Sequence, residues 1–180
     1  MTEHHFTLVL TPDSGLADGT AIEALGEAGA TDATIGRGPD GVWTAVFDRE
    51  AATFEEAIKS AIGDVRSAGL VVRHVEPDDL VTQAEIADRL GRTSESIRLL
   101  ASGQRGDGSF PSPAVRTTNR GSLWRWSEVA VWANLAPEVV ERARWIAIVN
   151  ARIQFDLHDT PKEKAMLKEA AGFLAGKRAV

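Results

Sequence analysis

The first 78 residues switch between two patterns of apolar positions, one typical of strands and one typical of helices. Short runs that alternate or are rich in β-branched residues predict four strands, at residues 6–10, 32–35, 42–47 and 70–75. Between them, apolar residues recur every three or four positions, which predicts two helices, the second capped by Thr53 with Glu56 three residues later. The order βαββαβ predicts a ferredoxin-like sandwich over residues 1–78 that folds as a domain of its own.

A short hinge, Pro77-Asp78-Asp79, precedes a second unit. Thr82 and Glu85 make a capping-box pattern at the start of one short helix, and Thr93 can cap another over residues 93–101. Two short helices joined by a tight turn that contains glycine are the layout of a helix-turn-helix.

A small β-ribbon is predicted behind these two helices. Residues 114–117 and 122–126 can pair across the turn between them, which makes a wing. Ser127 is expected to cap the helix that follows the wing. Residues 79–135 are therefore predicted to be a winged helix-turn-helix domain.

The last part of the chain, residues 136–180, is predicted to be a helical hairpin. One helix starts at Pro137 and runs to about Phe155, and Thr160 with Glu163 opens the other. The first of these helices is apolar on more than one face, so it must be buried on two sides. We expect the last helix to cover one side and a second subunit the other, which gives a homodimer. In the alternative, the helix lies between the two domains of one chain. The fold class expected for the whole chain is α+β.

The net charge of −6 is unevenly distributed along the chain. Residues 1–79 carry five basic and fifteen acidic side chains, a net charge of −10, whereas residues 80–135 and 136–180 each carry a net charge of +2. Residues 89–125 contain seven arginines and two acidic residues. Because attraction to phosphate depends on local charge, the arginine-rich middle is the part suited to nucleic acid, and the acidic first domain is not.

The residue types exclude several kinds of chemistry. Without cysteine, the chain has no disulfide framework, thiolate metal site or cysteine nucleophile. The four histidines lack metal-ligand spacing, and no catalytic triad or carboxylate pair can be argued from the sequence, so we expect no enzyme activity, metal or cofactor. No segment approaches the roughly 18 apolar residues of a membrane span, and no basic leader precedes an apolar stretch. We therefore expect a cytoplasmic protein without a membrane partner.

Three sequence motifs follow one another along the second unit: VTQAEIADRLGRTSESI at residues 81–97, FPSP at 110–113 and WRWSEVAVW at 124–132. Together they resemble the excisionase, AlpA and MerR-like group of bacterial and phage helix-turn-helix proteins. In the AlpA-type members an FPxP element leads into a basic wing and a W-x-x-S-E-V-x-x-W helix. The resemblance covers residues 80–135 and implies sequence-specific binding of double-stranded DNA, as in a bacterial transcriptional regulator.

The candidate DNA contacts follow from the chemistry of base edges and phosphates. A helix in the major groove needs short polar side chains and guanidinium groups near its N-terminal end, so we expect helix 93–101 to read bases. The wing is expected to contact the backbone or the minor groove. The candidates are Gln83, Arg92, Thr93, Ser94, Glu95, Ser96, Arg98 and Arg105, with Arg116, Thr118, Asn119 and Arg120 in the wing. The tryptophans at 124, 126, 132 and 145 are expected in cores.

Two other functions remain open from the sequence. In the first, the chain is an antitoxin-like interaction protein whose acidic N-terminal domain binds a protein partner and whose DNA binding is autoregulatory. In the second, the βαββαβ domain senses a small ligand, which rests on fold analogy alone.

Overall fold

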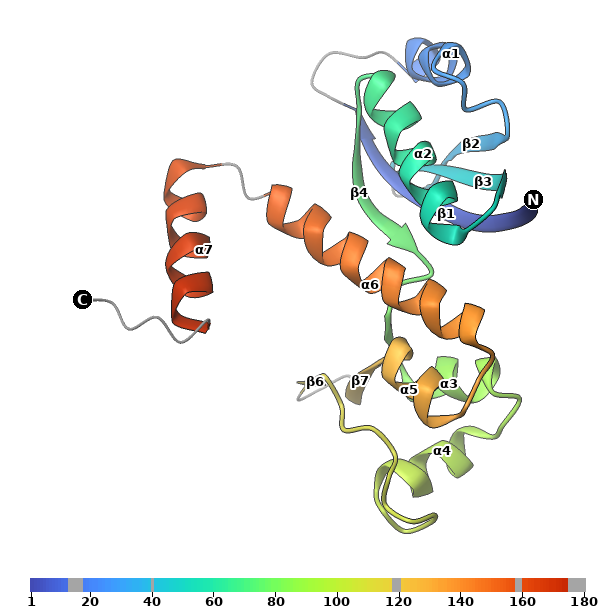
Figure 1. The fold of residues 1–180 in the computed structure, drawn as a ribbon, viewed down its shortest axis with the longest axis vertical. Coiled ribbons are helices and arrows are strands. Elements are labelled where there is room, and N and C mark those ends of the chain that lie inside the picture. Colours follow the sequence, from blue (N-terminus) through green and yellow to red (C-terminus); the bar gives the residue numbers. More distant parts are fainter. Residues whose placement is uncertain (13–17, 40, 118–120, 158–159, 175–180) are drawn as a thin grey trace.

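The computed structural model is a mixed α+β protein with antiparallel sheets (Figure 1). It describes residues 1–12, 18–39, 41–117, 121–157 and 160–174. The strands are β1 (Thr2–Pro12), β2 (Ala33–Arg37), β3 (Trp43–Ala51), β4 (Leu70–Glu76), β5 (Leu80–Val81), β6 (Val115–Thr117) and β7 (Gly121–Arg125). The helices are α1 (Asp18–Glu27), α2 (Phe54–Ser67), α3 (Gln83–Arg89), α4 (Ser94–Ala101), α5 (Trp126–Trp132), α6 (Pro137–Leu157) and α7 (Pro161–Leu174).

The first six elements form a four-stranded sheet together with helices α1 and α2. The strand order is β2-β3-β1-β4, and each neighbouring pair is antiparallel. Phe6 lies opposite Phe47 in the register, and their rings stack 5.5 Å apart in the core. Helix α2 buries its apolar stripe, including Ile58, on the same core. Its start is as predicted, because the Thr53 hydroxyl accepts a hydrogen bond from the Glu56 N–H.

A buried arginine ties this sheet to the chain around it. Arg49 on β3 donates from Nε and Nη2 to the two carboxylate oxygens of Asp32, each at 2.7 Å, and its Nη1 lies 2.7 Å from Asp64 on α2. The Arg49 Nη1 also donates to the Ser60 hydroxyl. The hydrogen bond from Arg49 lowers the pKa of Asp32 below its ordinary value. One side chain therefore joins the β3 strand, the segment before β2 and helix α2.

The outer edge of β4 is covered by α6 rather than by another strand. The Asn150 side-chain amide accepts from the Val75 N–H at 2.7 Å and donates to the Val75 carbonyl at 3.0 Å, as a neighbouring strand would. Gln154 donates to the Arg73 carbonyl one turn further along α6. Because an uncovered edge strand presents unpaired backbone groups, this contact protects the sheet from pairing with another chain.

A second core forms around the strands β5, β7 and β6, which lie in that order. Helices α3, α4 and α5 pack on it through buried residues such as Ile86, Ile97 and Val129. Trp124 and Trp126 are also buried there, as expected for core tryptophans.

Helix α6 belongs to both cores, which differs from the predicted separate hairpin. Ala143 packs in the second core, whereas Ile146 and Ile153 pack in the first. Figure 1 shows α6 running between the two parts of the molecule, which is the alternative arrangement considered for this helix. The first core is thus completed by residues far beyond position 78, so the expectation that residues 1–78 form a self-contained domain needs revision.

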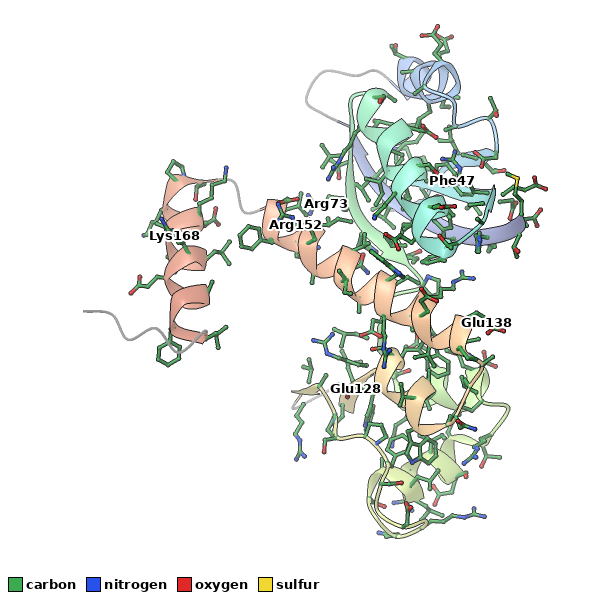
Figure 2. The ribbon with its side chains drawn as sticks, viewed as in Figure 1. Phe47, Arg73, Glu128, Glu138, Arg152 and Lys168 are labelled. Carbon is green, nitrogen blue, oxygen red and sulfur yellow. The ribbon has the colours of Figure 1, made fainter. Side chains whose placement is uncertain are left out.

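Helix α7 does not cover α6 as predicted. None of its described residues is buried, and its side chains, Lys168 among them, stand away from the rest of the molecule (Figure 2). Its start is nevertheless as expected, since Thr160 and Glu163 exchange capping hydrogen bonds. Trp145 packs against the first core, as expected for a core tryptophan.

The segment predicted as a hinge is a fixed junction. Asp79 is buried, and its carboxylate accepts from the Ser127 N–H at 2.8 Å and from Arg125 at 3.3 Å. The prediction that Ser127 caps the next helix is wrong, because α5 begins at Trp126 and Ser127 already lies inside it. The N-terminal N–H groups of α5 instead find their acceptors on Asp79, 48 residues earlier.

Candidate nucleic-acid interface

The two helices α3 and α4 start and stop as their sequences predict. Thr82 and Glu85 form both hydrogen bonds of a capping box, and the backbone bond from Thr82 lowers the pKa of the Glu85 carboxyl. The Thr93 hydroxyl accepts from the Ser96 N–H, so it caps α4. Gly91 has a φ of 61° in the turn between the helices, a conformation that favours glycine.

Helix α4 presents a polar face to solvent. Its apolar residues Ile97 and Leu100 are buried, whereas Ser94, Glu95 and Arg98 on the opposite side are exposed. Arg98 binds Glu95 through two hydrogen bonds, from Nε to Oε2 at 2.8 Å and from Nη2 to Oε1 at 2.7 Å. These bonds lower the pKa of Glu95 and raise that of Arg98, so both groups stay charged at neutral pH.

Aromatic residues fix the turn before α4 against the rest of the second core. The Arg92 guanidinium lies over the Trp132 ring of α5, 5.6 Å from its centre. Phe110 meets the rings of Trp132 and Trp124 edge to face, at 4.9 and 6.3 Å. The Trp124 Nε1 donates to the Pro111 carbonyl at 3.0 Å. Residues of the segments 81–97, 110–113 and 124–132 therefore form one cluster, which joins the turn before α4 to β7 and α5.

The β6–β7 hairpin supplies an exposed arginine. Arg116 lies opposite Ser122 in the pairing of the two strands and is solvent-exposed. The other wing candidates, Thr118, Asn119 and Arg120, lie outside the described residues. Figure 1 shows the hairpin and α4 on the same part of the molecule, away from the four-stranded sheet.

No family model, curated protein or solved structure matches this chain. Within the described ranges, no helix is long and apolar enough to cross a membrane. Across the same residues, no group of three or more His, Asp or Glu side chains is arranged to hold a metal ion.

The predicted contacts divide into three groups. The α4 residues Thr93, Ser94, Glu95 and Arg98 lie together on an exposed surface, although the Thr93 hydroxyl is used for the helix cap. Arg92, Ser96 and Gln83 are nearby but less available, because Arg92 stacks on Trp132 and the other two are half-buried. Arg105 and Arg116 are exposed on separate segments.

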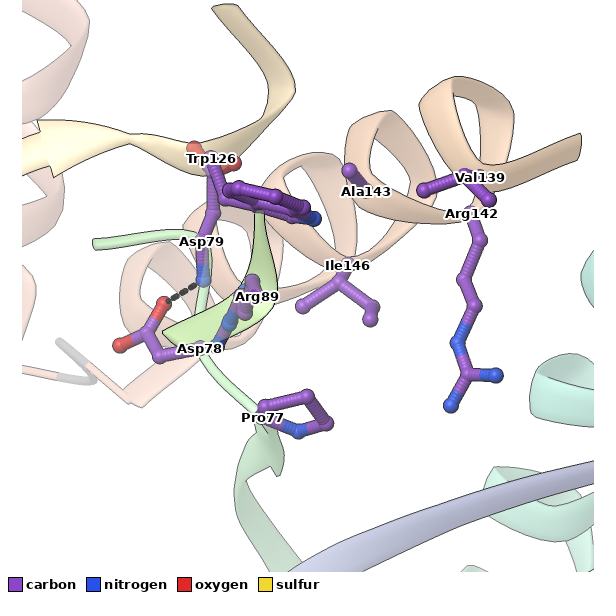
Figure 3. Close-up of a pocket in the computed structure, with 9 residues that line it drawn as sticks. All are labelled: Pro77, Asp78, Asp79, Arg89, Trp126, Val139, Arg142, Ala143 and Ile146. Carbon is purple, nitrogen blue, oxygen red and sulfur yellow. Dashed lines mark hydrogen bonds between the residues drawn. The ribbon is translucent and has the colours of Figure 1, made fainter. Parts of the chain in front are cut away.

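A cavity of about 260 Å³ lies at the junction between the two cores (Figure 3). Its walls include Trp126, Ile146 and the side chains of Arg89 and Arg142. Arg89 lies over the Trp126 ring, 4.9 Å from its centre, and burial lowers the pKa of both arginines. Asp78, also in the wall, accepts from the Asp79 N–H, the bond drawn in Figure 3.

Sequence reasoning missed the residues that position the site. Asp79 and Asn150 hold the second core and α6 in place through bonds that span 48 and 75 residues. Local patterns identify a cap only when donor and acceptor are a few residues apart, so no signal in the sequence reveals these two.

Proposed function

We propose that this protein binds double-stranded DNA in a sequence-specific manner, with α4 in the major groove and the β6–β7 hairpin on the backbone or in the minor groove. The observation that carries the proposal is the exposed polar face of α4, formed by Ser94, Glu95 and Arg98. This helix is the second of a short pair and is followed by a hairpin bearing Arg116, an order that fits a winged helix-turn-helix.

The rest of the chain is consistent with a regulator. The connection β1-α1-β2-β3-α2-β4 and the strand order β4-β1-β3-β2 fit a ferredoxin-like sandwich. Its acidic composition is unsuited to phosphate contact, which leaves DNA binding to the arginine-rich unit.

Selection of bound fragments from a random double-stranded pool, at a fixed salt concentration, tests the proposal. Enrichment of one short sequence by the full chain is the expected result. Absence of enrichment, with a folded protein and at low salt, would refute DNA binding as the function.

Removal of the hairpin arginine is expected to weaken binding without changing the preferred sequence. Arg116→Ala removes a phosphate contact, so affinity falls by a similar factor for specific and unrelated DNA. The slope of log affinity against log salt becomes shallower by about 1. Fluorescence anisotropy across a salt series measures both quantities. A changed binding-site logo would instead assign Arg116 to base reading.

We infer that the DNA-binding form is a dimer. One helix-turn-helix with one wing buries only about 600–1,000 Å² on DNA, which is little for tight specific binding. Helix α6 leaves Ile148 60% exposed, and α7 leaves Phe173 81% exposed, so both helices keep apolar surface available for a second copy.

Light scattering at micromolar concentration is expected to give about twice the chain mass of 19.3 kDa. Ile148→Asp is expected to reduce this to the monomer mass because the variant places a charge in the interface. Val131→Asp on α5, which also replaces an exposed apolar residue, is the matched control and leaves the mass unchanged. A monomer that binds a single half-site would contradict the dimer.

The junction cavity favours a second candidate function, the sensing of a small ligand. It is lined by the segment from Pro77 to Asp79 and by residues of α3, α5 and α6, so an occupant would contact the second core and the helix that both cores share. A thermal-shift screen with metabolites tests this function. A true ligand stabilises the protein but not the Val139→Trp variant, in which the new ring fills the cavity.

A further inference from the structure

The Glu95–Arg98 pair leaves one particular edge of the guanidinium available. An arginine side chain has five N–H donors: one on Nε and two on each Nη. Glu95 takes the Nε hydrogen and one Nη2 hydrogen, which form the side edge of the group. Both Nη1 hydrogens and the second Nη2 hydrogen remain, because among the described residues the Arg98 guanidinium donates hydrogen bonds to Glu95 alone.

The remaining edge of the guanidinium, between Nη1 and Nη2, has the donor spacing that guanine requires. Nη1 and Nη2 can donate two parallel hydrogen bonds, which match the N7 and O6 acceptors of guanine in the major groove. A phosphate is the poorer partner, because the Glu95 carboxylate beside the guanidinium would repel it, whereas a base edge carries no net charge. Both oxygens of Glu95 already accept from Arg98, which also limits the ability of Glu95 to read a base itself.

We infer that Arg98, held side-on by Glu95, reads one guanine in each half-site of the bound DNA. This inference rests on the proposed DNA-binding function and specifies the base that α4 recognises. Glu95 acts as a positioning residue: it fixes the direction of the guanidinium and cancels its charge, so that Arg98 discriminates between bases more than it attracts phosphate.

The two residues are expected to respond differently to substitution. Arg98→Ala loses the guanine from the selected sequence, and Arg98→Lys weakens the preference because an ammonium group has no planar fork. Glu95→Gln removes a negative charge near the DNA, so binding to unrelated DNA becomes tighter while the preference for guanine falls. A purely structural role of Glu95 would not produce this opposite change.

The decisive test uses 7-deazaguanine, which lacks the N7 acceptor. After selection with the full-length chain, each guanine of the enriched site is replaced in turn, and affinity is measured for the wild type and for Arg98→Ala. One position per half-site is expected to cost the wild type about 10-fold or more and to cost Arg98→Ala nothing further. Arg66→Ala, which removes an exposed arginine from α2 in the acidic domain, is the matched control and keeps the wild-type sensitivity at that position.

The outcomes separate the inference from the proposed function. If the wild type enriches no sequence, DNA binding itself is wrong. If a sequence is enriched but the 7-deazaguanine effects persist in Arg98→Ala, DNA binding stands and the assignment of Arg98 to guanine is overturned. Arg98 is an exposed residue, and circular dichroism of the variant verifies that it is folded before either result is used.

Discussion

Replacing Arg49 with alanine is expected to lower the free energy of unfolding by about 3–5 kcal/mol. The Arg49 side chain is only 10% exposed, and it is the ion-pair partner of both Asp32 and Asp64. Without it, two partly buried carboxylates face each other with no compensating charge. Urea titration followed by far-ultraviolet circular dichroism measures the loss.

Arg98→Ala is the matched control, because it breaks an arginine–carboxylate pair that is open to solvent and should leave the unfolding midpoint unchanged. The pH dependence gives a second readout. Since Arg49 lowers the pKa of Asp32, the contribution of the pair is present above the ordinary aspartate value of 3.8 and is lost as the pH falls below that value, through the lowered pKa of the folded state. In Arg49→Ala, the part of the pH dependence of stability that comes from this pair is expected to disappear. If Arg49→Ala lowers the free energy of unfolding by less than about 1 kcal/mol, the two carboxylates regain full hydration and the prediction is wrong.

Asp79→Ala is expected to destabilise the second core by about 2–3 kcal/mol. The change removes the acceptor for the Ser127 N–H at the start of α5 and the partner of Arg125, while the Asp79 side chain itself is only 2% exposed. Because α5 packs on α6 and on the cluster that positions α4, weaker DNA binding should accompany the loss of stability.

Asp79→Asn separates the two contributions. The amide keeps an oxygen for the Ser127 N–H but loses the ion pair with the partly exposed Arg125, so about half of the destabilisation or less is expected. Urea titration of both variants provides the comparison. Equal losses for alanine and asparagine would mean that the helix cap contributes nothing.

The local features of the fold could be predicted from the sequence, and the long-range ones could not. The caps at Thr53, Thr82, Thr93 and Thr160 were correct because each donor lies three residues from its acceptor. The same reasoning failed at Ser127, where the cap comes from a distant aspartate. The apolar pattern of α6 correctly indicated burial on more than one side, but a pattern does not identify what lies on each side.

The same division applies to the candidate site. The position of Ser94, Glu95 and Arg98 on one exposed face follows from helical periodicity, and the structure has them there. The stacking of Arg92 on Trp132 was not predictable, because it depends on how the loop at Phe110 packs between two tryptophans. Whether these residues contact DNA stays a prediction.

The covering of β4 by α6 has a consequence for how the protein is made. A ribosome adds about 5–20 residues per second, so Asn150 follows its partner Val75, 75 residues earlier in the chain, after about 4–15 s. During that interval the nascent sheet carries a bare outer strand and lacks the apolar contacts of Ile146 and Ile153. Two ribosomes translating the same message bring such sheets close together, and an uncovered strand can then pair with its counterpart on the neighbouring chain. Synthesis is therefore the stage at which this fold is most exposed to misassembly, and a chain that stops before α6 remains in that state.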